Sequence, residues 1–167
     1  TNLDGLFAAG SQLMGGGNYA GAAVTGRYAG RKMVEYALNT DIVLVDRDQQ
    51  KSERNRVYAP LKHKENGVGW KELRAGIARI MQEYCGLYKS DEILNAGLKW
   101  FEEIRKTEIE RAVARNPHEL WRTLECMVHI TAGEMIMHAS LARKASSHQL
   151  DFHRIDYPEP DPTEWSK

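Results

Sequence analysis

The chain begins Thr1-Asn2-Leu3-Asp4-Gly5-Leu6-Phe7-Ala8-Ala9-Gly10 and shortly afterwards continues Gly15-Gly16-Gly17-Asn18-Tyr19. Residues 5–9 have the apolar composition of a short buried strand, and the glycine-rich segment after them predicts a turn. Helical spacing then runs from Asn18, a favourable N-cap, to about Leu38. A strand that leads through a glycine-rich turn to a helix N-terminus is typical of an anion or cofactor cradle, because the first amides of a helix lack intrahelical acceptors.

One face of this predicted helix consists of small residues, which allow tight packing on a sheet or beside a flat ligand. They are Gly21, Ala22, Gly26, Ala29 and Gly30. Glycine adopts positive φ easily and lets a ligand approach the backbone, so we expect the glycine run before the helix to be functional. The pattern starts at residue 1, without a Met and with nothing before it to complete a sheet. We therefore expect a piece of a larger nucleotide-binding enzyme.

The 167 residues are sufficient for about one domain, or a small domain with an appendage, and 42% hydrophobic with 28% charged residues is ordinary for a globular protein. The 23 basic and 23 acidic residues give a formal net charge of zero. This balance gives no electrostatic reason to expect nucleic acid or an anionic membrane as a partner, and no apolar run approaches the roughly 18 residues of a membrane span. Cys85 and Cys126 lie among helix-patterned apolar residues, which predicts free buried thiols in a reducing compartment.

Between the glycine turn and the C-terminal half the pattern changes twice. Residues 41–45 (Asp-Ile-Val-Leu-Val) form a short apolar run, either a strand or a first helical turn. Residues 46–56 are densely charged with alternating sign, which favours a solvated helix over a basic binding patch. A polar, glycine-containing segment at 62–69 is the best candidate for a domain boundary. The predicted parts are a strand–turn–helix piece at 1–40, a charged helix and linker at 41–68, a helical bundle at 69–147 and a docked tail at 148–167.

Three long amphipathic helices are predicted in the bundle. The first runs from Trp70 to Gly86, the second is capped by Ser90, and the third runs from the Asn116-Pro117 start signal to about Ser146. The apolar stripe of the second consists of Ile93, Leu94, Leu98, Phe101, Ile104, Ile109 and Val113, and that of the third of Leu120, Leu124, Met127, Val128, Thr131, Met135, Ile136, Ala139 and Leu141. The short joints favour an up-down-up arrangement. The predicted fold class is mainly α: a three-helix bundle, preceded by the strand–glycine turn–helix and followed by an extended tail.

These segments, in this order, resemble the C-terminal part of the flavoprotein subunits of the fumarate reductase and succinate dehydrogenase family, which includes adenylylsulfate reductase and aspartate oxidase. The resemblance covers essentially the whole chain. The matching segments are residues 5–10, 15–19, 26–30, 70–74, 80–86, 114–120 and 152–158. The resemblance implies that residues 1–40 are the last strand, turn and helix of an FAD-binding α/β domain.

The resemblance also implies a flavin contact at the start of the first helix. The backbone amides near Asn18 and Tyr19 would face the pyrimidine edge of the isoalloxazine ring, where a reduced flavin carries negative charge that a helix N-terminus stabilises. The residues expected to bind the cofactor are Gly10, Ser11, Gly15, Gly16, Gly17, Asn18 and Tyr19. No catalytic residue and no metal ligand is expected in the chain.

Two departures from the family limit what the resemblance implies. Members that bind fumarate or succinate carry a His-Gly-Ala-Asn-Arg stretch before the glycine pair, whereas residues 11–14 here are Ser-Gln-Leu-Met and offer no cation to a dicarboxylate. The acidic residue that often follows the strand glycine and contacts FAD is replaced by Ser11. The family's GxGxxG fold and its capping domain have no counterpart in the sequence, so we expect these 167 residues alone to be catalytically silent.

The parent protein is expected to carry out flavin-dependent hydride or electron transfer on a small acid or oxyanion substrate. The expected partners are the FAD domain of the parent, an iron–sulfur subunit, and a second copy docked through the helix at 19–38. The expected location is the cytoplasm, peripheral to the inner membrane through partner subunits. Two alternatives stay open: a non-catalytic helical interaction domain, and a separate small subunit that completes a flavin site in trans.

Structural roles are favoured for the other polar and sulfur-containing side chains. His129 and His138 lie nine residues apart, which is not the spacing of a helical pair of metal ligands. Glu125 and Glu134 lie near the apolar stripe of their helix and are expected to pair with arginines across the bundle. Arg154 in the tail is expected to form a docked salt bridge. The methionines expected in the core are Met127, Met135 and Met137.

Overall fold

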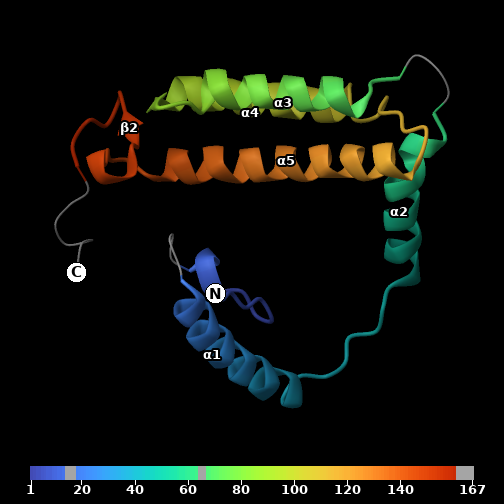
Figure 1. Ribbon diagram of the computed structural model, residues 1–167, viewed down its shortest axis with the longest axis vertical. Coiled ribbons are helices and arrows are strands. Elements are labelled where there is room, and N and C mark those ends of the chain that lie inside the picture. Colours follow the sequence, from blue (N-terminus) through green and yellow to red (C-terminus); the bar gives the residue numbers. More distant parts are fainter. Residues whose placement is uncertain (14–17, 64–66, 161–167) are drawn as a thin grey trace. The chain divides into compact units, whose positions relative to one another are not determined.

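The computed structural model describes residues 1–13, 18–63 and 67–160. Within these residues the chain is mainly α-helical, as predicted, with five α-helices, three short 3-10 helices and two strands of two residues each (Figure 1). It divides into two compact units, Thr1–Arg47 and Asp48–Lys167. The division falls inside the segment predicted as a charged helix and linker. None of the described helices is long and apolar enough to cross a membrane.

The first unit is built around helix α1, Tyr19–Leu38, which begins where the sequence predicted. Asn18 has an extended backbone, and its side-chain oxygen accepts a hydrogen bond from the amide of Gly21 at 2.8 Å, so it is the N-cap. Ahead of α1, a single 3-10 turn, η1, spans Gly10–Gln12.

The strand predicted at residues 5–9 is not formed. Gly5 lies in a turn with φ +75°, and the residues that follow it have no regular secondary structure. A strand needs a neighbouring strand to pair its backbone groups, and no described residue of this unit provides one. The ring of Phe7 instead packs edge-on against that of Tyr36 in α1, with 5.9 Å between centroids. The apolar run Ile42–Val45 is also irregular, and its side chains are 73–94% exposed.

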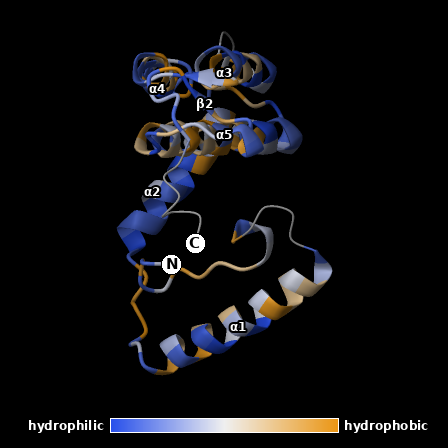
Figure 2. Cartoon of the chain, turned by 90° about the vertical axis from the view of Figure 1, so that its left-hand side faces the viewer, coloured by the Kyte–Doolittle hydropathy of each residue, from blue (hydrophilic) through white to orange (hydrophobic). Residues whose placement is uncertain are grey.

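Helix α2, Arg47–Tyr58, has the solvated character predicted for the charged segment. None of its residues is buried, and Figure 2 shows it hydrophilic along most of its length. A 3-10 turn, η2, Ala59–Leu61, follows it. The guanidinium of Arg56 reaches the sulfur of Met127 at 3.4 Å, which brings the end of α2 against the helical bundle.

Helices α3 (Trp70–Tyr84), α4 (Asp91–Lys106) and α5 (Pro117–Ala142) form the predicted three-helix bundle, and each packs against the other two (Figure 1). Two of the helix starts follow local signals in the sequence. The side chains of Ser90 and Asn116 accept hydrogen bonds from first-turn amides of α4 and α5, at 3.2 and 2.9 Å.

Two helix ends differ from the prediction. α4 ends at Lys106, so Ile109 and Val113 lie beyond it. α5 ends at Ala142 rather than near Ser146. In both places the backbone beyond the helix pairs with another segment. Ala112 forms an isolated parallel bridge with Val68, and Ser146 forms one with Pro160 in the tail.

The core of the bundle is apolar and centred on side chains with no exposure, such as Leu94, Phe101 and Ile130. The whole cluster comprises Val68, Leu73, Ile77, Ile80, Leu94, Phe101, Ala112, Cys126, Ile130 and Met137. Cys126 is buried and Cys85 partly buried, and both are free thiols, as predicted. Burial raises the pKa of both thiols, which keeps them protonated and unreactive.

Most of the apolar stripe predicted for α5 lies away from the core, although Leu141, one of its members, packs against the core. The residues that α5 buries are Thr123, Cys126, Ile130, Gly133, Met137 and Ser140. Of the three methionines predicted in the core, Met137 alone is buried, whereas Met127 is partly exposed and Met135 is 67% exposed. α5 carries apolar residues on both faces, so helical periodicity does not identify the core side. Close packing of the Phe101 ring over Gly133 selects the face with the small residues.

The tail packs against the bundle through a short parallel pair of strands, β1 (Tyr88–Lys89) and β2 (His153–Arg154). A 3-10 turn, η3, His148–Leu150, precedes β2. The hydroxyl of Ser146 accepts the amide N–H of Arg154 and donates to a carbonyl further along the tail, both at 2.9 Å. The tail residue Trp165, predicted to lie in the docked segment, is outside the described residues.

Candidate functional site

The glycine turn expected to bind a cofactor is described in part. Gly10 has φ +71°, a left-handed conformation that glycine adopts without strain, and its amide donates to Oγ1 of Thr25 at 2.9 Å. The Thr25 hydroxyl donates in turn to the carbonyl of Gly21 at 2.6 Å. These two bonds hold the η1 turn, including the exposed Ser11, beside the first turns of α1. The expected site residues Gly15, Gly16 and Gly17 lie outside the described residues.

The N-terminus of α1 presents backbone donors that the described residues of its unit do not use. Asn18 accepts the amide of Gly21, and no described residue accepts a hydrogen bond from the amide of Tyr19 or Ala20. The first turn contains no acidic side chain, and Tyr19 is 97% exposed. Since the helix dipole adds partial positive charge here, this end is suited to an anion or to the electron-rich edge of a ring.

Little of α1 is covered within its own unit. Of its 20 residues, Ala29 alone is buried. Val24 and Tyr28 are 70% and 67% exposed. A Cβ added at Gly26 or Gly30 would meet nothing within 4 Å, so packing inside the described unit does not require these glycines. An exposed apolar helix face with small residues is typical of a surface that packs against another body.

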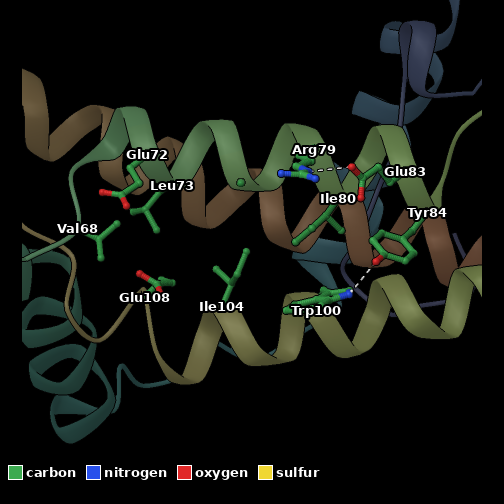
Figure 3. Close-up of a pocket in the computed structure, with 11 residues that line it drawn as sticks. Val68, Glu72, Leu73, Arg79, Ile80, Glu83, Tyr84, Trp100, Ile104 and Glu108 are labelled. Carbon is green, nitrogen blue, oxygen red and sulfur yellow. Dashed lines mark hydrogen bonds and ion pairs between the residues drawn. The ribbon is translucent and has the colours of Figure 1, made fainter.

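The bundle has a groove of its own between α3 and α4, with a volume of about 500 Å³ (Figure 3). Its walls are apolar: Leu73 and Ile80 project from α3, and Trp100 and Ile104 project from α4. At one end the indole N–H of Trp100 donates to the hydroxyl of Tyr84 at 2.9 Å. This volume lies within the range of ligand and docking sites.

Charged side chains surround this α3–α4 groove. Glu72, Glu83 and Glu108 contribute three carboxylates and Arg79 one guanidinium, so the lining has a net charge of −2. Arg79 donates to Glu83 at 2.8 Å, and this hydrogen bond raises the pKa of the Arg79 guanidinium. No described residue forms a hydrogen bond or ion pair with the side chain of Glu72 or Glu108.

The salt bridge predicted for Arg154 is confirmed, and its guanidinium is buried. Arg154 is 1% exposed; its guanidinium donates to the carboxylates of Asp156 and Asp91 and to the main-chain carbonyls of Ser140 and Arg143. The hydrogen bonds from Arg154 lower the pKa of Asp156 to about 2. A guanidinium so fully committed to the tail and helix ends is a structural residue rather than one that reaches out to a substrate.

Of the two glutamates predicted to pair across the bundle, one does so. Glu134 on α5 accepts two hydrogen bonds from Arg105 on α4, at 2.9 and 2.7 Å. Glu125 instead pairs with Arg122 on its own helix, because residues three apart on a helix lie on the same face within reach of each other. Among the described residues, no three His, Cys, Asp or Glu side chains come together to hold a metal ion.

Two features of these sites were not identified from the sequence. Thr25 fixes the η1 turn, and the signal for it was a β-branched hydroxyl residue inside an otherwise small-residue helix. The hydrogen bond between Trp100 and Tyr84 forms only when α3 and α4 pack against each other, and no local sequence pattern predicts it.

Comparisons with known proteins agree with this architecture. The family model described as fumarate reductase flavoprotein C-term matches residues 74–167. The fumarate reductase flavoprotein subunit of Haemophilus influenzae is 25% identical over all of this chain and 30% of its own length. Among solved structures, adenylylsulfate reductase from Archaeoglobus fulgidus superposes with a TM-score of 0.78 at 21% identity, over 87% of this chain and 26% of that one. Quinol fumarate reductase from Escherichia coli gives 0.69 at 21% identity, with the same two coverages.

The bundle and its docked tail thus define the C-terminal helical region of a flavoprotein subunit. The chain belongs to the fumarate reductase and succinate dehydrogenase flavoprotein family, through its C-terminal region. It spans about 30% of the curated relative that it matches.

Proposed function

We propose that this chain is the C-terminal part of an FAD-dependent oxidoreductase of the fumarate reductase and succinate dehydrogenase type, and that the start of α1 faces the flavin. The observation that supports this most directly is the set of unpaired backbone donors at the N-terminus of α1. The amides of Tyr19 and Ala20 have no acceptor among the described residues, and no acidic side chain in the first turn competes for them. Membership of a flavoprotein family supports a flavin as the group that meets them.

The residues at this helix start fit one edge of FAD. Bound FAD supplies hydride and electron transfer chemistry, and its reduced ring carries negative charge near N1 and O2. Main-chain amides suit that edge because they stabilise the charge without a side chain that titrates. In this proposal Asn18 holds the first turn in place, and Tyr19 and Ala20 donate their amides to the ring edge. Gly10 and Ser11 lie in the adjoining η1 turn, and Gly15, Gly16 and Gly17 are further proposed cofactor-binding residues.

We further propose that the bundle is structural and that these 167 residues alone are catalytically silent. The groups that would be reactive elsewhere are engaged: the cysteine thiols have raised pKa values, and Arg154 and Glu134 are held in ion pairs. The loop Ser11–Leu13 has no cationic side chain, so a dicarboxylate substrate would need its cations from another part of the parent protein.

The partners in this proposal are the FAD domain of the parent, an iron–sulfur subunit and a second copy that docks on the exposed face of α1. The proposed location is cytoplasmic, peripheral to the inner membrane through partner subunits. Structural relatives are found in larger assemblies, such as the Mycobacterium smegmatis Sdh1 complex, which superposes with a TM-score of 0.71 over 24% of its matched chain. The exposed Val24 and Tyr28 support a contact surface on α1.

A first experiment is the visible absorbance of the purified chain after incubation with FAD and desalting. We expect no retained band at about 450 nm, because in this proposal the chain supplies only one edge of the cofactor site. A retained band would contradict the proposal that this chain holds only part of a flavin site.

A second experiment tests the α1 amides in a flavin-loaded protein that contains this chain. Tyr19→Pro removes one amide donor, and proline is well tolerated at the first position of a helix. The backbone of Asn18, φ −88° and ψ 174°, already suits a following proline. Losing a hydrogen bond to a charged group costs about 1.5–3 kcal/mol, so we expect the two-electron potential to fall by about 30–60 mV relative to Tyr19→Ala. Equal potentials for the two variants would rule out this amide as a flavin donor.

A further inference from the structure

We propose that the α3–α4 groove binds an amphipathic helix of a partner protein whose apolar stripe is flanked by Lys or Arg. All the residues of this groove belong to the second unit of the chain. The proposal is therefore independent of the role of α1 at a flavin, and neither depends on the other's test.

The shape of the groove favours a helix over a compact ligand. On α3 the lining residues extend from Glu72 to Tyr84, at positions spaced by three or four. At 1.5 Å per residue this wall is about 18 Å long, which is the length of about three turns of helix. A hollow that follows two packed helices over that distance is the surface into which the side-chain ridge of another helix inserts. Figure 3 shows the lining side chains in a row along both helices rather than around a closed chamber.

The middle of the groove is kept open by Gly76. A glycine inside a helix lowers its stability relative to alanine, so its presence calls for a reason. A Cβ at this position would meet only the Cδ1 atom of Ile104, at 3.9 Å, which is ordinary contact. Packing within the chain therefore does not require a glycine here. The missing side chain leaves room at the centre of the groove for an incoming side chain.

The charges around the groove define the flanks of the partner helix. The net charge of the lining is −2, and Glu72 and Glu108 have side chains without a described partner. Glu108 is half-buried, so a carboxylate there gains from a cation brought by the partner. The hollow beside α5 is different: its charged lining residues are Arg56 and Arg105, and both are paired with glutamates.

An aromatic anchor lies at the Tyr84 end of the groove. Trp100 is 51% exposed, and its single polar atom is already satisfied by the Tyr84 hydroxyl. The rest of the indole is apolar surface, which gains by being covered and can also receive a cation over its face. Tryptophan is enriched among the residues that contribute most to binding at protein–protein interfaces.

The test uses the full chain and two synthetic helical peptides of about 18 residues, which is about one and a half times the length of the groove and allows for fraying at the ends. Both carry Leu at heptad positions a and d. One has Lys at e and g, and the other has Glu. Fluorescence anisotropy of the labelled peptides measures binding at low and high salt. We expect the Lys peptide to bind at least tenfold more tightly than the Glu peptide, with a preference that shrinks at high salt.

Matched variants locate the binding. Gly76→Leu fills the centre of the groove and should abolish binding of the Lys peptide, whereas Ala132→Leu, on an exposed position of α5 in another hollow, should not change it. Glu72→Gln combined with Glu108→Gln should weaken binding about tenfold at low salt. The control pair Glu92→Gln with Glu110→Gln removes the same charge outside the groove and should have less than a twofold effect.

Three outcomes would overturn the proposal. They are equal affinity for the two peptides, unchanged affinity in the Glu72→Gln and Glu108→Gln variant, and sedimentation showing a dimer of this chain that Gly76→Leu dissociates, since the occupant would then be a second copy. Circular dichroism melts verify that each variant folds. If Gly76→Leu is unfolded, Gly76→Ala takes its place, because its methyl group also enters the groove.

Discussion

Replacing Arg154 by methionine should destabilise the bundle strongly, although the residue is in the tail and in none of the three helices. Arg154→Met keeps most of the aliphatic length and removes the guanidinium. In the native structure that group donates five hydrogen bonds, to the carboxylates of Asp91 and Asp156 and to the carbonyls of Ser140 and Arg143. With methionine in place, the two carbonyls at the C-terminus of α5 lose their donor and remain near an apolar side chain.

The size of the loss in unfolding free energy depends on how exposed each acceptor of Arg154 is. The side chains of Asp91 and Asp156 are 48% and 28% exposed, so water replaces much of what they lose. The contact to the carbonyl of Ser140 is buried and that to the carbonyl of Arg143 is partly buried. A buried acceptor left without a donor costs about 1–3 kcal/mol. Breaking a buried ion pair from one side costs about 3–5 kcal/mol when both partners are buried. We therefore expect a loss of about 3 kcal/mol, below the middle of that range.

Urea unfolding followed by circular dichroism measures this loss. With a slope of about 1.5 kcal/mol/M, the midpoint should fall by about 2 M. Arg79→Met is the matched control: Arg79 also pairs with a glutamate, but it is 78% exposed, and its removal should cost less than about 0.5 kcal/mol. If the two variants shift the midpoint equally, the hydrogen bonds of the buried Arg154 guanidinium contribute no more to stability than an exposed ion pair.

Two further predictions concern stability. The pKa of Asp156 is about 2 in the folded chain, against an ordinary value of 3.8, so the unfolded chain takes up the proton first as the pH falls. The stability that this carboxylate contributes above about pH 5 should therefore be lost as the pH falls toward 2, by about 1–2 kcal/mol. Urea titrations at several pH values should show this loss in the native chain and not in Asp156→Asn. Gly133→Ala places a Cβ 2.7 Å from the Phe101 ring and should lower stability by about 1–3 kcal/mol, whereas Gly76→Ala, which meets no such obstacle, should raise it by up to about 1 kcal/mol in thermal unfolding.

The parts of the fold that the sequence predicted well depend on neighbours in the chain. The starts of α1, α4 and α5 follow from Asn18, Ser90 and Asn116, whose side chains cap amides three residues on. The charged segment became the solvated helix α2 because alternating charges leave it no apolar face to bury. The assignment of the bundle to a flavoprotein family came from the resemblance, because helix caps and apolar stripes do not distinguish one protein family from another.

The parts that were wrong depend on distant contacts. The strand expected at residues 5–9 needs partner strands, and an apolar run without them stays irregular. The core face of α5 is chosen by the fit of Phe101 against Gly133, and both faces of that helix are apolar enough to satisfy a periodicity count. Size, rather than hydrophobicity, separates the two faces: the buried one is rich in Thr, Gly, Cys and Ser.

The site residues divide in the same way, and Arg154 shows why. Its pairing with Asp156, two residues on, was within reach of the sequence. Asp91 comes from the first turn of α4, and the two carbonyls come from the end of α5. A helix C-terminus carries partial negative charge and unsatisfied carbonyls, so a cation belongs there. One guanidinium thus donates both to the carbonyls at the end of α5 and to the carboxylate of Asp91. These two sets of acceptors come together only when the bundle has placed the start of α4 beside the end of α5. Their shared need for a donor fixes where the tail docks.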